Sequence, residues 1–590
     1  MKKIIKLLLL FLAFSKTISA QFYGQRNYSI GIPSYTPLVN SVKKTNTFSN
    51  GYISGMYVPT NSYSKPFWIK KTNIHGLFAS SDDFLVYYKL YKDNNCSQIQ
   101  TNPTFCSGID VIEASTSSTP TNGARYALTS IHSGTASGEF IVFATLNQNG
   151  SVVSSQFYDL PNGCTIGNYP SIVESISNPG SFYLAGSYDI SGIIYTYVIH
   201  VKSSGNIIWS SNYSCGPRLA ARDIIVSPYN NNEIILVGEA MPGNNQPPFF
   251  NVATQGFVLR LNANNGNIKQ LINYGYDTQI YTKNQLFQCI EPRYQVINGS
   301  PGFIIGGSSD PINLQGNTGI GRAWICSIDT SGNLNSSTLL ASAGSQIYSV
   351  IERLNPNNNQ FEYYGSTYDS YPMVYKFDSN LNLFPTGMNR FEFNNNTFIS
   401  NNGFNVLMTE ENSGGSDDGF QVFCNDFTNL NMIYFIKSYF NGVSGCNENQ
   451  LFDFYDSGPN QIYYPTCSQI GGYTTYSCQT FELFKSDINP NIQTLCASAN
   501  VPNGSNLKPT SIESFSIQRN DYAYYDGVKI IIKSNARQQI QISQPDGKII
   551  YSNIIEAGEF EISQEINISD GLYFIKFENN DIYKIVVFGR

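Results

Sequence analysis

Short apolar runs recur between residues 181 and 385 in a fixed order, with turn residues between them. Each copy has an apolar run that ends at a glycine, a second run with alternating apolar residues, a polar turn rich in Asn and Gly, and a third short run. The four clearest copies place that glycine at Gly186, Gly238, Gly307 and Gly365. Apolar runs of this length, separated by Asn-Gly-type turns, are typical of β-strands joined by tight hairpins.

Each copy predicts four short strands once an earlier apolar run, such as residues 171–176, is included. Four strands in about 50 residues are typical of a β-propeller blade. Fainter copies at residues 52–55, 126–128, 404–407 and 462–464 bring the prediction to seven or eight blades. A row of β-sandwiches also gives many short strands, but it lacks a fixed order that recurs at this spacing, so we predict a propeller over residues 21–495.

The first twenty residues carry a targeting pattern. Lys2 and Lys3 precede an apolar run over residues 4–14, and Ile18-Ser19-Ala20 offers the small residues that a signal peptidase recognises. The apolar run is too short for a permanent membrane anchor. We therefore predict a signal peptide over residues 1–20 and a mature chain that begins at Gln21 and is exported.

Composition narrows the class of partner. Charged residues make up 13% of the chain, aromatic residues 14%, and the net charge is −7. Nucleic acids and anionic lipids require clustered Lys and Arg, so we expect neither as a partner. A weakly charged surface rich in tyrosine favours contact with glycans or proteins instead.

Eleven cysteines fit an oxidising compartment and favour structural disulfides over metal binding. The expected pairs are Cys96–Cys106 and Cys467–Cys478, with Cys164–Cys215, Cys289–Cys326 and Cys424–Cys446 as further candidates and Cys496 left over; connectivity cannot be read from sequence. No Cys-x-x-Cys pair occurs, and the three histidines are widely separated, so we expect no metal site and no cofactor. Asp417-Asp418 allows a Ca²⁺ loop, but a solvated turn is the favoured interpretation.

The last eighty residues form a separate strand-rich segment after a polar linker over residues 496–510. Six apolar runs lie in residues 528–587, which predicts a small, immunoglobulin-like β-sandwich over residues 511–590. Three motifs stand in order within it: Asp546-Gly547-Lys548-Ile549, Gly571-Leu572-Tyr573-Phe574 and Lys584-Ile585-Val586-Val587.

In motif order and C-terminal position, this segment resembles the type A sorting domain of proteins exported by the type IX secretion system of Bacteroidetes. The resemblance implies passage through the periplasm, docking on the outer-membrane translocon, and release or attachment to surface lipopolysaccharide after removal of the tag. The chain departs from the family in continuing to Phe588-Gly589-Arg590. The alternative is an ordinary C-terminal immunoglobulin-like module, since such sandwiches recur without a shared function.

Acidic residues often follow the glycine of the repeat. They are Asp189, Glu239, Asp310 and Asp369. In a propeller these residues lie on one rim, where carboxylates can bind a sugar or a cation or, in pairs, hydrolyse a glycosidic bond. The competing interpretation is that an Asp after a strand simply caps a turn. The same applies to residues 327–332, which are similar to the Asp-box of sialidase propellers but favour a hairpin turn.

The sequence contains no catalytic motif, such as Gly-x-Ser-x-Gly, His-Glu-x-x-His or a phosphate-binding loop. Two hypotheses remain for the exported propeller. It is a binding or adhesion protein for an extracellular glycan or protein, or it is a secreted glycoside-type hydrolase with an acidic site in the central funnel.

Overall fold

The computed structural model describes the chain in segments between Phe22 and Val587. The longer described segments are 105–115, 124–134, 138–160, 170–241, 254–276, 283–297, 300–311, 322–340, 346–355, 360–368 and 372–383, and elsewhere the described residues are the strands named below. All regular structure in these residues is β-strand. None of them forms a helix long and apolar enough to cross a membrane.

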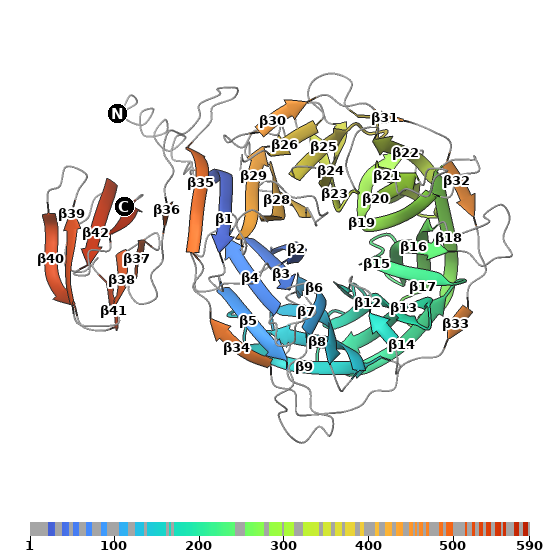
Figure 1. The fold of residues 1–590 in the computed structure, drawn as a ribbon, viewed down its shortest axis with the longest axis horizontal. Helices are drawn as coiled ribbons and strands as arrows, with labels where there is room; N and C mark the ends of the chain where they lie inside the picture. The colour runs from blue at the N-terminus through green and yellow to red at the C-terminus, as the bar shows by residue number, and fades with distance from the viewer. Residues whose placement is uncertain are drawn as a thin grey trace, which may run out of the picture.

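Antiparallel sheets are arranged around a common centre in a propeller-like ring (Figure 1). The ring is built from units of consecutive strands that run from the centre outward, and one eleven-stranded sheet contains two of these units. The units are β2 (Leu38–Thr45), β3 (Gly51–Tyr57), β4 (Phe67–Asn73) and β5 (Phe84–Leu90); β6 (Phe105–Glu113), β7 (Tyr126–Gly134), β8 (Gly138–Leu146) and β9 (Val152–Asp159); β11 (Ser171–Glu174), β12 (Ser181–Ile190), β13 (Ile193–Lys202) and β14 (Ile207–Ser214); β15 (Arg218–Val226), β16 (Glu233–Met241), β17 (Gln255–Asn262) and β18 (Ile268–Tyr276); β19 (Lys283–Ile297), β20 (Ser300–Pro311), β21 (Arg322–Asp329) and β22 (Leu334–Leu340); and β23 (Ser349–Asn355), β24 (Gln360–Tyr368), β25 (Pro372–Phe377) and β26 (Arg390–Phe393).

The first strand of each unit faces the centre, and these inner strands contact one another in a closed circle. The order around the circle is β2, β6, β11, β15, β19, β23 and β27 (Leu407–Glu411), and then β2 again. The last unit combines both ends of the ring: β27, β28 (Gly419–Asp426) and β29 (Met432–Tyr439) pair in order, and β1 (Phe22–Ser29) adds to β29. The N-terminal strand therefore closes the circle.

The predicted repeat is confirmed in its strand order. Gly186, Gly238, Gly307 and Gly365 all lie in the second strand of a unit, and the run after each of them forms the third strand. The core lies between units, because both faces of each sheet are apolar. One buried cluster, for example, joins Ile235 and Val258 of one unit to Phe303 and Trp324 of the next.

After the ring is complete, the chain pairs again with the outermost strands. The added strands are β30 (Glu448–Leu451) on β26, β31 (Tyr455–Asp456) on β22, β32 (Asn460–Tyr463) on β18, β33 (Ser468–Ile470) on β14, β34 (Leu483–Asp487) on β5, and β35 (Asn491–Ala499) on β1. They lie at the outer edge of the ring in Figure 1. The prediction that residues 462–464 are another copy of the repeat is wrong, because β32 is an added edge strand of an earlier unit.

Residues beyond β35 form two small antiparallel sheets beside the ring (Figure 1). One contains β37 (Tyr522–Tyr525), β38 (Ile530–Ser534) and β41 (Gly558–Glu561); the other contains β39 (Gln538–Ser543), β40 (Ile549–Ile555), β42 (Gly571–Phe577) and β43 (Ile582–Val587). The buried side chains include Ile532 in the first sheet and Ile540 and Ile575 in the second. Two further short strands, β10 (Cys164–Ile166) and β36 (Ser514–Phe515), pair with β12 and β35.

A tyrosine of one unit repeatedly bonds to a turn of the next. The hydroxyl groups of Tyr158, Tyr213 and Tyr274 donate to the carbonyl oxygens of Gly205, Gly266 and Gly332, each over 2.6 Å. Each glycine lies in the hairpin between the third and fourth strands and has a φ between 73° and 87°. We call these contacts the tyrosine latches.

The next junction keeps the geometry with different residues. The Thr338 hydroxyl donates over 2.5 Å to the carbonyl oxygen of Leu381, which stands in the corresponding turn with a φ of 64°. A left-handed backbone is costly for leucine. Leu381 adopts this conformation because other contacts hold the turn. Among them, the Asp378 carboxylate accepts hydrogen bonds from the amides of Asn380 and Asn382.

Substitution of two glycines measures separately how much stability is lost through the backbone conformation and how much through the packing at a latch. Gly192 has a φ of 85° and open space around an added Cβ, whereas at Gly266 an added Cβ would lie 2.7 Å from the Trp209 ring and 2.9 Å from the Tyr213 hydroxyl. Gly192→Ala should destabilise the protein by about 1 kcal/mol through its backbone alone. Gly266→Ala should cost about 1 to 3 kcal/mol more, because Trp209 and Tyr213 must move. Urea denaturation monitors both variants; equal losses would contradict the packing role of the latch.

Candidate functional site

Three of the four acidic residues predicted as a site share one end of the second strands. Asp189, Glu239 and Asp310 lie near the C-terminal ends of β12, β16 and β20, and Asp369 follows β24 directly but lies outside the described residues. The backbone of Asp310 pairs with Asn284 of β19. Because the second strands are equivalent in each unit, the three described positions, Asp189, Glu239 and Asp310, belong to the same rim of the ring.

Asp189 acts as a turn cap. Its Oδ1 accepts a hydrogen bond of 2.8 Å from the Gly192 amide, across the tight turn between β12 and β13. Ser191 and Gly192 both have positive φ, as a two-residue hairpin of this type requires. The carboxylate therefore stabilises a turn, which is the competing interpretation given above for an Asp after a strand.

Glu239 is almost fully buried and held by two arginines. Arg218 and Arg222 both direct an Nη2 toward its Oε1, with the Arg222 contact at 2.8 Å. Burial opposes ionisation of Glu239, but the two guanidinium groups hold the pKa of its carboxyl below the usual value. Its charge is thus compensated within its own unit.

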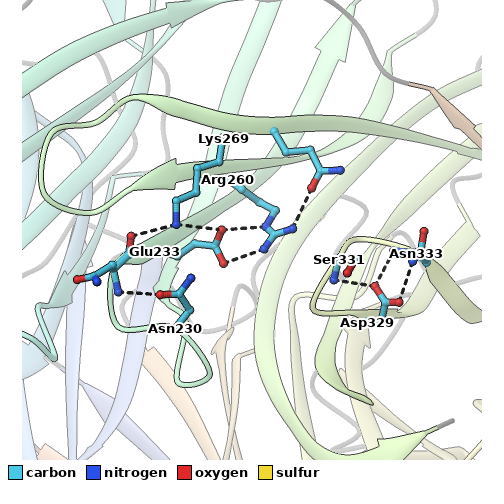
Figure 2. A network of polar contacts seen from close by, with 9 residues as sticks. Asn230, Glu233, Arg260, Lys269, Asp329, Ser331 and Asn333 are labelled. Carbon is cyan, nitrogen blue, oxygen red and sulfur yellow. Dashed lines mark hydrogen bonds and ion pairs between the residues drawn. The ribbon is translucent and has the colours of Figure 1, made fainter. Parts of the chain in front are cut away.

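A second buried glutamate is compensated in the same way near the opposite rim. Glu233, at the start of β16, accepts from Arg260 through both carboxylate oxygens, at 3.0 and 2.9 Å, and Lys269 lies 3.7 Å away (Figure 2). Figure 2 also shows the Asp329 turn of the next unit, where Asp329 accepts from the amides of Ser331 and Asn333. The Asp-box-like segment is therefore a hairpin turn, as predicted.

At the centre of the ring, Asp110 joins three neighbouring inner strands. Its carboxylate accepts from the Ser41 hydroxyl of β2, from the Ile172 amide of β11 at 2.8 Å, and from the Ser171 hydroxyl at 3.3 Å. It also accepts from the next amide of its own strand, at 2.8 Å. These hydrogen bonds to its charged carboxylate hold the Asp110 side chain in one position.

Asp223 repeats this arrangement two units further on. It accepts from the Ser171 hydroxyl of β11 at 3.1 Å, from the Ile290 amide of β19 at 3.0 Å, and from the following amide of β15 at 2.9 Å. Ser171 thus connects the two aspartates. Five consecutive inner strands, from β2 to β19, are linked by this chain of hydrogen bonds, which we call the central aspartate chain.

Two further charged residues belong to this centre. Lys43 on β2 lies in the field of Asp110, Asp223 and Glu291, which raise the pKa of its amine even though burial lowers it. The Glu291 side chain on β19 touches solvent but is surrounded by protein, and this reduced hydration raises the pKa of its carboxyl to about 7, with Lys43 opposing and Asp223 adding to the shift. A carboxyl with this pKa can exchange a proton near neutral pH.

Sequence reasoning missed Lys43, Asp110, Asp223 and Glu291. The available signal was a charged residue inside an apolar run, as in Ile109-Asp110-Val111 and Ile290-Glu291. Such a residue in a strand usually has a buried partner. Its partners stand on other units, however, about sixty residues away in the chain, so the spacing alone does not reveal the cluster.

Several disulfide predictions are wrong. Cys106, Cys164, Cys215, Cys289 and Cys326 are buried free thiols, and burial raises the pKa of Cys106 to about 12. Cys289 and Cys326 lie two strands apart, about 9 to 10 Å, and in core clusters on opposite faces of their sheet, so no disulfide can join them. Cys164 and Cys215 likewise belong to different clusters. The other predicted partners, Cys96, Cys446, Cys467 and Cys478, lie outside the described residues.

The two described histidines, His132 and His200, lie in the core, and His75 lies outside the described residues. His132 stacks on Phe140 and His200 on Tyr183, and burial lowers their pKa values to about 3 and about 4. Within the described part of the chain, no group of three or more His, Cys, Asp and Glu side chains is placed to hold a metal ion. Asp417-Asp418, the segment considered for Ca²⁺, lies outside that part.

The residues predicted to form a sorting motif are described in part. Asp546, Gly547 and Lys548 lie outside the described residues, whereas Gly571 and Tyr573 stand on β42 and Lys584 on β43. These two strands pair antiparallel, with Tyr573 opposite Ile585 and Phe574 opposite Lys584. The second and third motifs are therefore neighbours in one sheet.

The central cluster predicts a specific pH dependence. Between the ordinary pKa of 4.5 and about 7, the folded chain holds a proton on Glu291 that the unfolded chain has released. The contribution of Glu291 to the free energy of unfolding therefore falls as the pH rises through this window. Glu291→Gln should lose less stability than the wild type between pH 5 and 8 in urea titrations. Parallel curves for the two proteins would contradict the assignment.

Comparisons with known proteins give a distant likeness to several solved structures. Drosophila Semaphorin 2a has 10% identity, a TM-score of 0.41, and coverage of 96% of this chain and 97% of its own. Chaetomium thermophilum Sqt1 bound to the N-terminus of ribosomal protein L10 has 12% identity, a TM-score of 0.36, and coverage of 70% and 98%. Synechocystis apocarotenoid oxygenase has 10% identity, a TM-score of 0.30, and coverage of 73% and 95%. No protein-family profile and no curated protein matches the sequence.

Proposed function

We propose that this chain is a secreted or cell-surface binding protein. Its ring is a seven-bladed propeller, in which the N-terminal strand β1 completes the last blade, and it displays a binding surface for an extracellular glycan or protein. Residues 1–20 direct the chain to the periplasm. Residues 511–590 form a sandwich that the type IX translocon recognises, after which the propeller is released or attached to surface lipopolysaccharide.

The observation that carries the binding function is the state of the acidic rim. Asp189 caps a hairpin and Glu239 is neutralised by Arg218 and Arg222. Neither carboxylate is arranged as a general acid or a nucleophile, so two of the four acidic residues on which the hydrolase was predicted serve the fold instead. A ring held by many contacts between its units is suited to presenting a fixed surface.

The export route is supported by the tail. From β37 onward its strands form two small sheets with their own buried isoleucines, separate from the sheets of the ring; only the two-residue β36 pairs with β35 of the ring. The ring is connected to them by a polar stretch, residues 500–510. A module of this kind can be recognised independently of the cargo.

A glycoside hydrolase remains the second candidate because of Glu291. This exposed carboxyl beside Lys43 has a pKa of about 7, a value suited to a general acid. A panel of chromogenic glycosides and a glycan array separate the two functions. We expect array binding without turnover; turnover that disappears in Glu291→Gln would establish the hydrolase.

The tail predicts where a truncated chain accumulates. A chain that lacks residues 511–590 should fold, because β1–β35 complete the ring, and should remain in the periplasm. Fractionation followed by immunoblotting locates both forms. The propeller domain should appear outside the cell only when it carries the tail, and normal surface display of the truncated chain would refute the sorting function.

A further inference from the structure

The hairpin of β19 and β20 is unusually long and rises from the rim opposite the acidic residues. β19 has fifteen residues and β20 twelve, whereas the inner strand β11 has four and β23 seven. Asp310 pairs near the start of β19, while Arg293 pairs with Gly302 near its other end. Residues 293 and 294 therefore stand at the rim that carries the C-terminal ends of the inner strands.

Neighbouring units fix the backbone at this point. The Arg293 carbonyl accepts a hydrogen bond of 2.6 Å from the Tyr229 hydroxyl of the preceding unit. The Tyr294 amide donates to the Glu352 carboxylate of the following unit, which also accepts over 2.9 Å from the Tyr363 hydroxyl. Two consecutive residues are thus held from both sides.

The Tyr294 side chain is nevertheless 68% exposed, more than any other large hydrophobic side chain among the described residues. A ring that remains in water on a fixed backbone is typical of a contact surface, since little freedom is lost on binding.

Other apolar side chains lie at the same ends of inner strands. Tyr229 follows β15, packs edge-to-face on Phe303 and is half-buried, and its pKa is raised to about 12 by burial, Glu352 and the nearby Tyr294. Leu354 on β23 and Ile176 after β11 are each 47% exposed. Aromatic and aliphatic side chains are therefore exposed at this rim, and the Glu352 carboxylate beside Tyr294 is engaged by the contacts above.

We propose that Tyr294, with Tyr229 beside it, forms the binding surface for an uncharged carbohydrate. The negative π face of a tyrosine attracts the C–H groups of a sugar ring, and the phenol hydroxyl bonds to sugar hydroxyls. A single exposed ring with scattered aliphatic neighbours matches the size of a sugar unit. A stable protein interface needs about 800 Å² on each side, with a continuous buried centre. The weakly acidic chain also disfavours anionic glycans.

The assignment rests on the proposed binding function and is tested with the full exported chain. Affinity electrophoresis in gels that contain soluble neutral polysaccharides, together with an array of uncharged glycans, measures wild type, Tyr294→Ala and Tyr294→Phe. Binding should weaken about tenfold in Tyr294→Ala and be largely retained in Tyr294→Phe, because the ring provides the contact. Ile193→Ala, at a 40% exposed isoleucine near the other rim, is the matched control and should bind as the wild type.

Each outcome decides the assignment. Equal glycan binding by the wild type and Tyr294→Ala would refute the site while leaving the binding function intact. A wild type that binds only an extracellular protein, or only acidic glycans, would refute the uncharged carbohydrate as ligand. A wild type that turns glycosides over would overturn the proposed function itself, and the panel of chromogenic glycosides measures that turnover separately from binding.

Discussion

The structure depends on the joining of one sheet to the next, because each sheet is apolar on both faces and can bury neither face alone. Two sets of hydrogen bonds fix that junction at different distances from the axis. The central aspartate chain links the inner strands from β2 to β19. The tyrosine latches join Tyr158, Tyr213 and Tyr274 to turns of the following units. Between these two sets of bonds the sheets pack through apolar side chains. Apolar packing has no preferred direction, so the hydrogen bonds set how one sheet is aligned with the next.

The two sets differ in how visible they are in the sequence. The latch turns were predicted, since a glycine between polar residues at the end of an alternating run specifies a hairpin with a left-handed residue. The strand order also followed from the runs at Gly186, Gly238, Gly307 and Gly365. The aspartate chain was not predicted, because Asp110 and Asp223 bond to donors supplied by other units. Their meaning appears only once the ring brings those strands together.

The errors have the same origin. Cys289 and Cys326 are close in sequence, but the pleat turns them to opposite faces of one sheet. The run at residues 462–464 has the composition of a blade strand, yet it pairs with the finished edge of β18. The local pattern of apolar and polar residues predicts that a segment is a strand. Which strand it pairs with depends on which strand edges are still free when the ring is complete. In a ring with many similar edges, that choice is not encoded locally.

The same constraint explains where a binding surface can arise. The faces of the sheets are buried in the core, and the strands β30 to β35 cover six of the outer edges. The strand ends therefore remain as the places where exposed side chains can contact a ligand. At one end the described acidic side chains stabilise the fold: Asp189 caps a turn and Glu239 binds two arginines. At the other end the junction between units holds the backbone of Tyr294 and leaves its ring in solvent. The contacts that stabilise the junction therefore also hold the backbone that carries this tyrosine, and a binding surface there needs no movement of the scaffold.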